Sequence, residues 1–74
     1  MGVTMDVDIN VSAYTQISSC KVTVKRDGEI VYSGEVPQGV AALVLEDQTG
    51  SGQVVYEVTV NDTETWNETV DFDE

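Results

Sequence analysis

Residues 21–34 read KVTVKRDGEIVYSG, and this stretch decides the fold. Apolar and polar side chains alternate up to the turn dipeptide Asp27-Gly28 and alternate again after it. Alternation with period two is the pattern of a half-buried β-strand, and an Asp-Gly pair between two such runs is a strong hairpin signal. The stretch therefore predicts two antiparallel strands joined by a tight turn.

Two registers of this hairpin are open. A two-residue turn on Asp27-Gly28 pairs Lys25 with Ile30 and places Ile30 on the face opposite Val24. A three-residue loop with Gly28 in a left-handed bulge pairs Val24 with Ile30 on one face. Because a one-residue slip moves every side chain to the other face, we predict the bulged loop. It keeps four apolar residues in one core, namely Val22, Val24, Ile30 and Tyr32.

Residues 3–12, upstream of the hairpin, predict another half-buried strand. Its apolar positions are Val3, Met5, Val7, Ile9 and Val11. Residues 14–19 form a connection, in which Ile17 is expected to anchor the loop on the core. Cys20, the only cysteine, follows the apolar phase of the next strand. We interpret it as a small core hydrophobe, because free cysteines are commonly buried.

Downstream of the hairpin, Pro37-Gln38-Gly39 ends the second strand, because proline cannot donate to a β-ladder and glycine permits a reversal. Residues 40–45 are apolar throughout. That run favours a buried strand, or a strand with a bend, over a short helix. Residues 46–52 read EDQTGSG, which predicts a flexible polar loop.

The last part of the chain predicts a second hairpin, which turns at residues 61–64. One face of its first strand carries Val54, Tyr56, Val58 and Val60. The same phase of the return strand carries Trp66, Val70 and Phe72. Glu68 interrupts this phase. Either the strand has a bulge near Glu68, or Trp66 and Glu68 lie beyond the edge of the core.

These elements add up to a single domain over residues 1–74, because the chain of 74 residues is too short for two. About six or seven short strands separated by turn signals are typical of a small all-β, antiparallel β-sandwich. A domain of this length buries a thin core. Docking on a partner, or on a second copy of the chain, is one way to add stability.

The hairpin at residues 21–34 resembles the central hairpin of bacterial and archaeal immunoglobulin-like domains. Residues 56–62, YEVTVND, resemble their penultimate strand. The resemblance rests on strand pattern and turn chemistry and covers most of the chain. It implies an immunoglobulin-like β-sandwich of the kind found in halophilic archaea and their viruses. The chain departs from antibody-type domains, since it lacks their cysteine pair and its only tryptophan lies near its end.

The charge is strongly negative. Fourteen acids against three bases give a net charge of −11. Such a surface repels nucleic acid and anionic membranes, so we expect neither as a partner. Three interpretations compete: life in high salt, which screens the repulsion, docking on a basic surface, or imitation of the charge of DNA. The abundance of acid and the scarcity of lysine resemble proteins of salt-loving archaea and their viruses.

The inventory of reactive groups argues against catalysis. There is no histidine to act as a base or to activate the thiol of Cys20, and no glycine-rich phosphate loop. We therefore expect no enzyme, no cofactor and no zinc site. Three carboxylate pairs have the oxygen ligands that calcium prefers, but none has the spacing of a calcium loop. They are Asp6/Asp8, Glu46/Asp47 and Asp71/Asp73.

Two sets of residues are candidates for contact with other molecules. Every asparagine begins an N-glycosylation sequon, and the three are Asn10, Asn61 and Asn67. Their use requires export, which the N-terminal residues do not favour, since they resemble no signal peptide. The second set is a candidate interface. Val31 and Val55 face outward by strand phase, and Trp66 lies beside a turn.

The sequence predicts a non-enzymatic structural or interaction module, and the resemblance implies a virion surface protein that decorates a capsid or tail. Its partner is then a capsid or another large assembly, and a homo-oligomer is an alternative. One competing hypothesis is an acidic inhibitor that mimics DNA and blocks a nucleic-acid enzyme. Another is an adhesive module at the cell surface. The corresponding locations are the virion surface, the cell surface or the cytoplasm.

Overall fold

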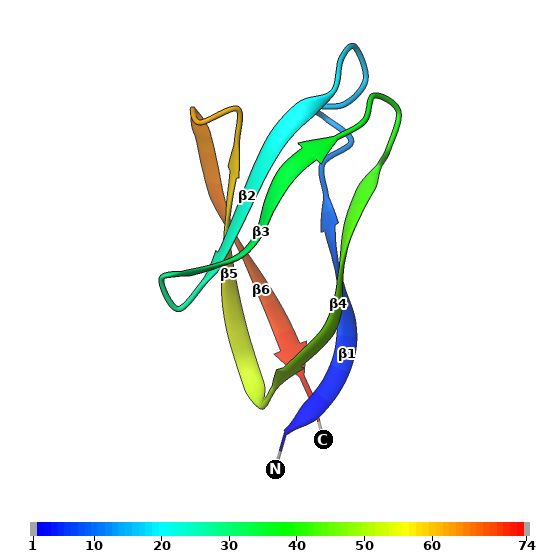
Figure 1. The fold of residues 1–74 in the computed structure, drawn as a ribbon. Coiled ribbons are helices and arrows are strands. Elements are labelled where there is room, and N and C mark those ends of the chain that lie inside the picture. The colour runs from blue at the N-terminus through cyan, green and yellow to red at the C-terminus, as the bar shows by residue number, and fades with distance from the viewer. Residues whose placement is uncertain (1, 74) are drawn as a thin grey trace.

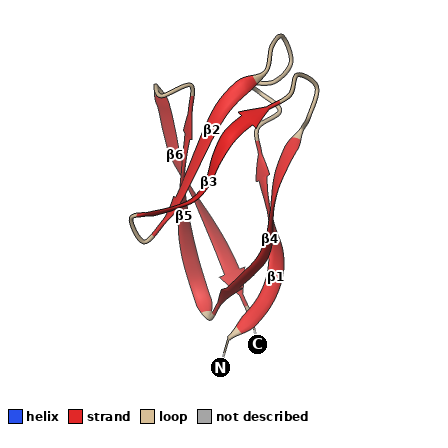
Figure 2. Cartoon of the chain, in the orientation of Figure 1, coloured by secondary structure: helices blue, strands red, loops and turns tan. Residues whose placement is uncertain are grey.

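A computed structural model describes residues 2–73 as an all-β domain of antiparallel strands (Figures 1 and 2), which confirms the predicted fold class. The strands are β1 Val3–Asn10, β2 Cys20–Arg26, β3 Glu29–Val36, β4 Ala42–Gly50, β5 Gly52–Val60 and β6 Glu64–Phe72. No helix occurs within the described residues, and none is therefore long and apolar enough to cross a membrane.

The strands form two sheets that face each other. One contains β1 and β4, and the other has the strand order β3-β2-β5-β6. The domain is elongated, with extents of 41 × 21 × 16 Å. The predicted apolar phases meet between the sheets. Core residues under 5% exposed are Val7, Ile9, Val11, Cys20, Val22, Val24, Val36, Leu45, Tyr56, Val58, Val60 and Phe72.

The β2–β3 hairpin corrects the predicted register. Lys25 pairs with Ile30 across a two-residue turn, in which Asp27 and Gly28 have φ of 53° and 80°. Two positive φ values give the hairpin turn whose twist matches that of the flanking strands, which is why the tight turn forms. Ile30 is 60% exposed, so the expectation that it joins the core is wrong.

A bulge one residue later restores the apolar phase of this hairpin. The register shifts between Val24 and Lys25, so that Val24 pairs with Tyr32 and Val31 is the extra residue. Tyr32 thus packs against the core as predicted, although its strand partner is Val24 and not Val22. The tight turn therefore forms while the apolar face stays buried, and Val31 is left without a partner on β2.

The predicted loop at residues 46–52 is also wrong, because β4 continues to Gly50 and only Ser51 separates it from β5. A bulge accommodates the polar residues. Asp47 has φ of 54°, and its N–H donates to Oδ1 of Asp6 on β1 at 3.1 Å. The run at residues 40–45 does enter a strand at Ala42, as expected. Only its last residue is fully buried, and Val44 faces solvent.

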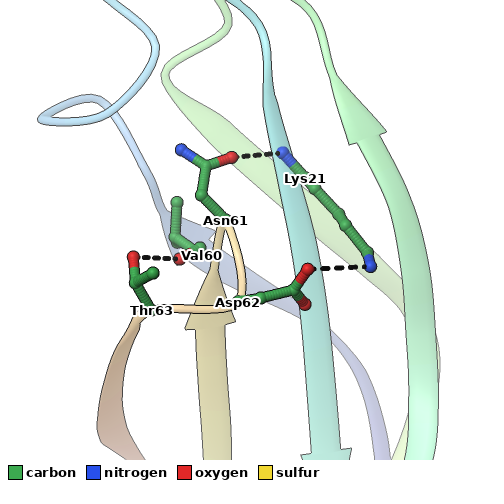
Figure 3. A network of polar contacts seen from close by, with 5 residues as sticks. All are labelled: Lys21, Val60, Asn61, Asp62 and Thr63. Atoms are coloured by element: carbon green, nitrogen blue, oxygen red, sulfur yellow. Dashed lines mark hydrogen bonds and ion pairs between the residues drawn. The ribbon is translucent and has the colours of Figure 1, made fainter.

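The predicted second hairpin is confirmed. Asn61 and Asp62 both have positive φ at the turn between β5 and β6. Figure 3 shows how this turn is tied to β2: Oδ1 of Asn61 accepts from the N–H of Lys21 at 3.0 Å, and Nζ of Lys21 lies 3.2 Å from Oδ2 of Asp62. Thr63 Oγ1 donates to the Val60 carbonyl at 3.5 Å and closes the turn.

Strand β6 pairs with β5 in unbroken register from Glu64 to Phe72, so no bulge accompanies Glu68. Strand β6 is an edge of the four-stranded sheet, which leaves Glu68 half-buried rather than enclosed. Its Oε1 accepts from Nε1 of Trp66 at 3.0 Å. This hydrogen bond gives the Glu68 carboxylate a partner and explains why a glutamate is tolerated at an otherwise apolar position of the strand.

Candidate functional site

Two loops meet at the end of the domain opposite the labelled N and C ends (Figure 1), and we call them together the tip: residues 11–19 and 37–41. Backbone hydrogen bonds join them. The N–H of Val11 donates to the Ala41 carbonyl at 2.9 Å, and the N–H of Gly39 donates to the Thr15 carbonyl at 2.8 Å. Because both loops are held on each other, the tip is one structural unit.

Thr15 lies at the centre of the tip. It is 2% exposed, and its Oγ1 donates to the Val40 carbonyl at 2.6 Å. A buried hydroxyl needs such a partner, since an unpaired one destabilises the fold. At the rim, Nε2 of Gln38 donates to the Gln16 carbonyl at 3.2 Å. Thr15 therefore holds the loop where the sequence predicted that Ile17 would.

Ile17 points away from the core, and the expectation that it anchors the loop is wrong. Its side chain is 89% exposed, and Val40 in the other loop is 37% exposed. None of the fourteen acids and three bases of the chain lies within the tip. The tip is thus an uncharged surface with exposed apolar side chains on a domain whose net charge is −11.

Aromatic stacking connects the tip to strand β6. The rings of Tyr14 and Trp66 stack with centroids 5.5 Å apart. The hydroxyl of Tyr14 donates to Oε2 of Glu64 at 2.8 Å. This hydrogen bond raises the pKa of Tyr14 above its ordinary value, because the neutral phenol is the form that donates to the carboxylate. Trp66 packs against the core while it supports the tip.

The structure does not bring the three predicted interface residues together. Val31 and Val55 are 39% and 48% exposed and lie on the outer face of the four-stranded sheet. Trp66 pairs with the buried Val58, on the opposite face of the same sheet. Val31 and Val55 therefore lie on one candidate surface, whereas Trp66 stacks on Tyr14 of the tip.

The three sequon asparagines are all exposed. Oδ1 of Asn10 accepts from both the N–H and the hydroxyl of Ser12, at 2.9 and 2.8 Å. Asn61 uses its Oδ1 to fix the β5–β6 turn, as described above. Asn67 lies on the outer face of the four-stranded sheet, where it pairs with Glu57. A glycan at Asn67 would cover that face.

The candidate calcium pairs are on the surface, and no group of three or more ligating side chains is placed to hold a metal ion within residues 2–73. Asp6 and Glu46 lie in the bulged part of the two-stranded sheet. Asp71 shares a hydrogen bond with Asp73, and this bond and the adjacent negative charge raise the pKa of Asp71.

Cys20 is a core residue, as predicted, with 2% of its surface exposed. Burial raises the pKa of its thiol, and the negative charge of Glu35 adds to the effect. The thiol therefore stays protonated over a wider pH range than a solvated one, which makes it a poor nucleophile.

Sequence reasoning found Val31 and Val55 from strand phase, but it missed the tip. The signal that would have revealed the tip is the absence of charge from residues 11–19 and 37–41 in so acidic a chain. Comparison of the chain with protein-family models, with curated proteins and with solved structures found no match.

Proposed function

We propose that this chain is a non-enzymatic interaction module that docks on a protein partner through its tip. The observation that carries the proposal is the uncharged tip with Ile17 at 89% exposure on a domain of net charge −11. An exposed isoleucine contributes nothing to the core, whereas burial in a partner releases about 1.5–3 kcal/mol. The proposal therefore gives Ile17 a role that the fold does not.

The rigidity of the tip supports the same proposal. Binding through loops usually costs free energy, because the loops must be ordered when the partner arrives. Here Thr15 and the hydrogen bonds between the two loops fix the backbone beforehand. The stack of Tyr14 on Trp66 holds the side of the tip against the sheet. A preformed apolar surface of this kind binds without that ordering cost.

We further propose that the partner belongs to a large assembly such as a capsid or tail, and that the domain is displayed on a virion surface. The resemblance of residues 21–34 and 56–62 to immunoglobulin-like domains supports this setting, as does the acidic composition typical of halophiles. A cell-surface adhesive module uses the same tip chemistry. Extraction from the native source, with identification of the assembly that retains the protein, separates these settings.

A second candidate function is a DNA mimic, which a different face favours. The outer face of the two-stranded sheet carries Asp6, Asp8 and Glu46, and neither β1 nor β4 contains a base. Carboxylates at alternate positions of a strand lie about 6.8 Å apart, which gives a regular row of negative charge. Such a surface binds a basic cleft and loses affinity as salt screens the charges.

Capture from the native extract distinguishes the two functions. The immobilised protein is incubated with the extract at about 0.15 M and about 1 M potassium chloride, and the retained proteins are identified. Docking by the tip predicts retention at both salt concentrations, loss with Ile17→Asp and no loss with Asp6→Asn/Asp8→Asn. Loss of the retained protein at high salt and with the two Asn substitutions, but not with Ile17→Asp, would establish the mimic and overturn docking.

A further inference from the structure

We propose that the outer face of the four-stranded sheet is a self-association surface, on which a second copy of this chain packs about a two-fold axis parallel to the strands. This surface is distinct from the tip, and the proposal does not depend on the proposed function. It rests on the register of the charged residues across β2 and β5, on a face that also carries exposed apolar residues.

Exposed apolar side chains gather on this face. Six large hydrophobic residues of the described chain are prominently exposed, and three of them lie here: Ile30 at 60%, Val31 at 39% and Val55 at 48%. The bulge in β3 is the reason that two consecutive apolar residues, Ile30 and Val31, are both exposed. Natural edge strands usually carry charge or proline at such positions.

Two of the three bases of the chain also point outward here. Lys21 and Lys25 are on the solvent phase of β2, whereas Arg26 lies over the rings of Tyr56 and Phe72 at 5.8 and 5.6 Å. Elsewhere within residues 2–73 the acids are accompanied by one base, the partly exposed Arg26. A second copy with net charge −11 is therefore repelled least by the face that carries both lysines.

The register places opposite charges side by side on the two central strands. Lys25 on β2 pairs with Glu57 on β5, and the same row continues to Ile30 on β3 and Asn67 on β6. Within residues 2–73, Lys25 and Glu57 form no ion pair with each other or with another residue. Both charges are available to a partner.

A two-fold axis that runs along the strands, midway between β2 and β5, places β2 of each copy opposite β5 of the other. It lays Lys25 of one copy over Glu57 of the other, and the reciprocal pair forms at the same time. In the next row Thr23 pairs with Thr59. The same axis lays Thr23 of one copy over Thr59 of the other, so that hydroxyl groups face each other. Face-to-face sheets tolerate this arrangement with an angle of about 30° between their strands.

The alternative axis, perpendicular to the strands, is disfavoured. If it passes through Thr23, it lays Lys25 over Lys21 of the second copy, because these lysines are equally distant from Thr23 along β2. Like charges placed opposite each other destabilise an association. The axis parallel to the strands is therefore the arrangement that pairs each charge with its opposite.

The size of the face sets the expected strength. Four strands at about 4.8 Å spacing and the length of β2 at about 3.4 Å per residue give a face of roughly 19 by 24 Å. This is below the roughly 800 Å² per partner of a stable standard interface. We therefore expect a weak dimer, which forms in the upper part of the accessible concentration range.

Charge reversal tests the arrangement by sedimentation equilibrium of the full chain from about 10 µM to about 1 mM in about 0.15 M potassium chloride. The wild-type mass should rise from 8.0 kDa towards twice that value. Lys25→Glu alone and Glu57→Lys alone should each weaken association at least about tenfold. The Glu57→Lys result is diagnostic, because this change lowers the net negative charge and would strengthen association if repulsion alone decided it.

The decisive measurement is the sedimentation equilibrium of an equimolar mixture of the two variants. In the mixed pair, each reversed side chain meets its opposite, so a heterodimer should form with affinity close to that of the wild-type dimer. Asp8→Lys, on the outer face of the other sheet, is the control and should leave association intact. A wild-type chain that stays at 8.0 kDa, or a mixture that associates no better than either variant alone, overturns the proposal.

Discussion

Tyr14 and Trp66 stack with their ring planes 12° apart, and this contact joins a residue of the tip to a residue of the edge strand β6. The two residues are far apart in the sequence, and each also donates a hydrogen bond to a glutamate of β6. The contact therefore fixes the first tip loop against the four-stranded sheet.

Loss of the indole should cost more stability than loss of the tyrosine hydroxyl. Trp66→Ala removes the stack and the packing on the core, and we expect it to lower the free energy of unfolding by about 2 kcal/mol. Tyr14→Phe keeps the stack and removes only the hydrogen bond to Glu64, so we expect a loss below about 1 kcal/mol. Urea unfolding followed by circular dichroism measures both. Equal losses would show that the stack contributes little.

Gly50 has no room for a side chain on its strand. A Cβ added there would lie 2.9 Å from Cγ of Phe72, which belongs to a ring that is fully buried in the core. We expect Gly50→Ala to lower the free energy of unfolding by about 1–3 kcal/mol, as overpacking does.

Gly34→Ala is the matched control, because Gly34 is also a strand glycine without positive φ. Its added Cβ would meet the hydroxyl of Tyr32 at 2.9 Å, the far end of a partly exposed side chain that can turn aside. Thermal unfolding of the two variants should show the larger loss for Gly50→Ala. A loss as large for Gly34→Ala would contradict the rigid fit of Phe72.

The Asp71–Asp73 pair should make stability depend on pH. The pKa of Asp71 is raised by Asp73, so the folded chain binds a proton there more tightly than the unfolded chain. A carboxyl with a raised pKa stabilises the fold below its unfolded pKa of about 3.9, and this contribution is lost as pH rises through the folded pKa. Asp73→Asn should therefore raise the melting temperature at neutral pH, and the gain should vanish in acid.

Asp8→Asn is the control for the loss of one negative charge, since Asp8 is an exposed acid on the other sheet. Melting temperatures between about pH 2.5 and pH 7 give the comparison. A gain for Asp73→Asn that matches the control, or persists unchanged in acid, would show that the pair has no specific effect.

Much of the core was predictable because strand side chains repeat with period two. Val22, Val24, Tyr56 and Val58 were assigned from that local pattern, and all are buried. Ile30 was wrongly assigned to the core. The two-residue turn with positive φ at Asp27 and Gly28 pairs Ile30 with Lys25, and this pairing places Ile30 on the outer face. The bulge that then restores the phase leaves no sign in an alternating pattern.

The candidate site was harder to predict, because loop side chains follow no period. Strand phase identified Val31 and Val55 as exposed, and the structure agrees. An apolar residue in a loop usually anchors it, and that reasoning failed for Ile17, because Thr15 fills this role through its hydroxyl. Only the three-dimensional meeting of residues 11–19 with 37–41 shows that two uncharged segments make one surface.

The central claim is that Ile17 is exposed for binding and not for folding. The most direct test measures two quantities for the same variant, the free energy of unfolding and the amount of partner retained from the native extract at about 1 M potassium chloride. Ile17→Ser should change the free energy of unfolding by less than about 0.5 kcal/mol and abolish retention. Val44→Ser, at a 48% exposed position on the two-stranded sheet, should preserve both. Full retention of the partner by the stable Ile17→Ser variant would contradict the account.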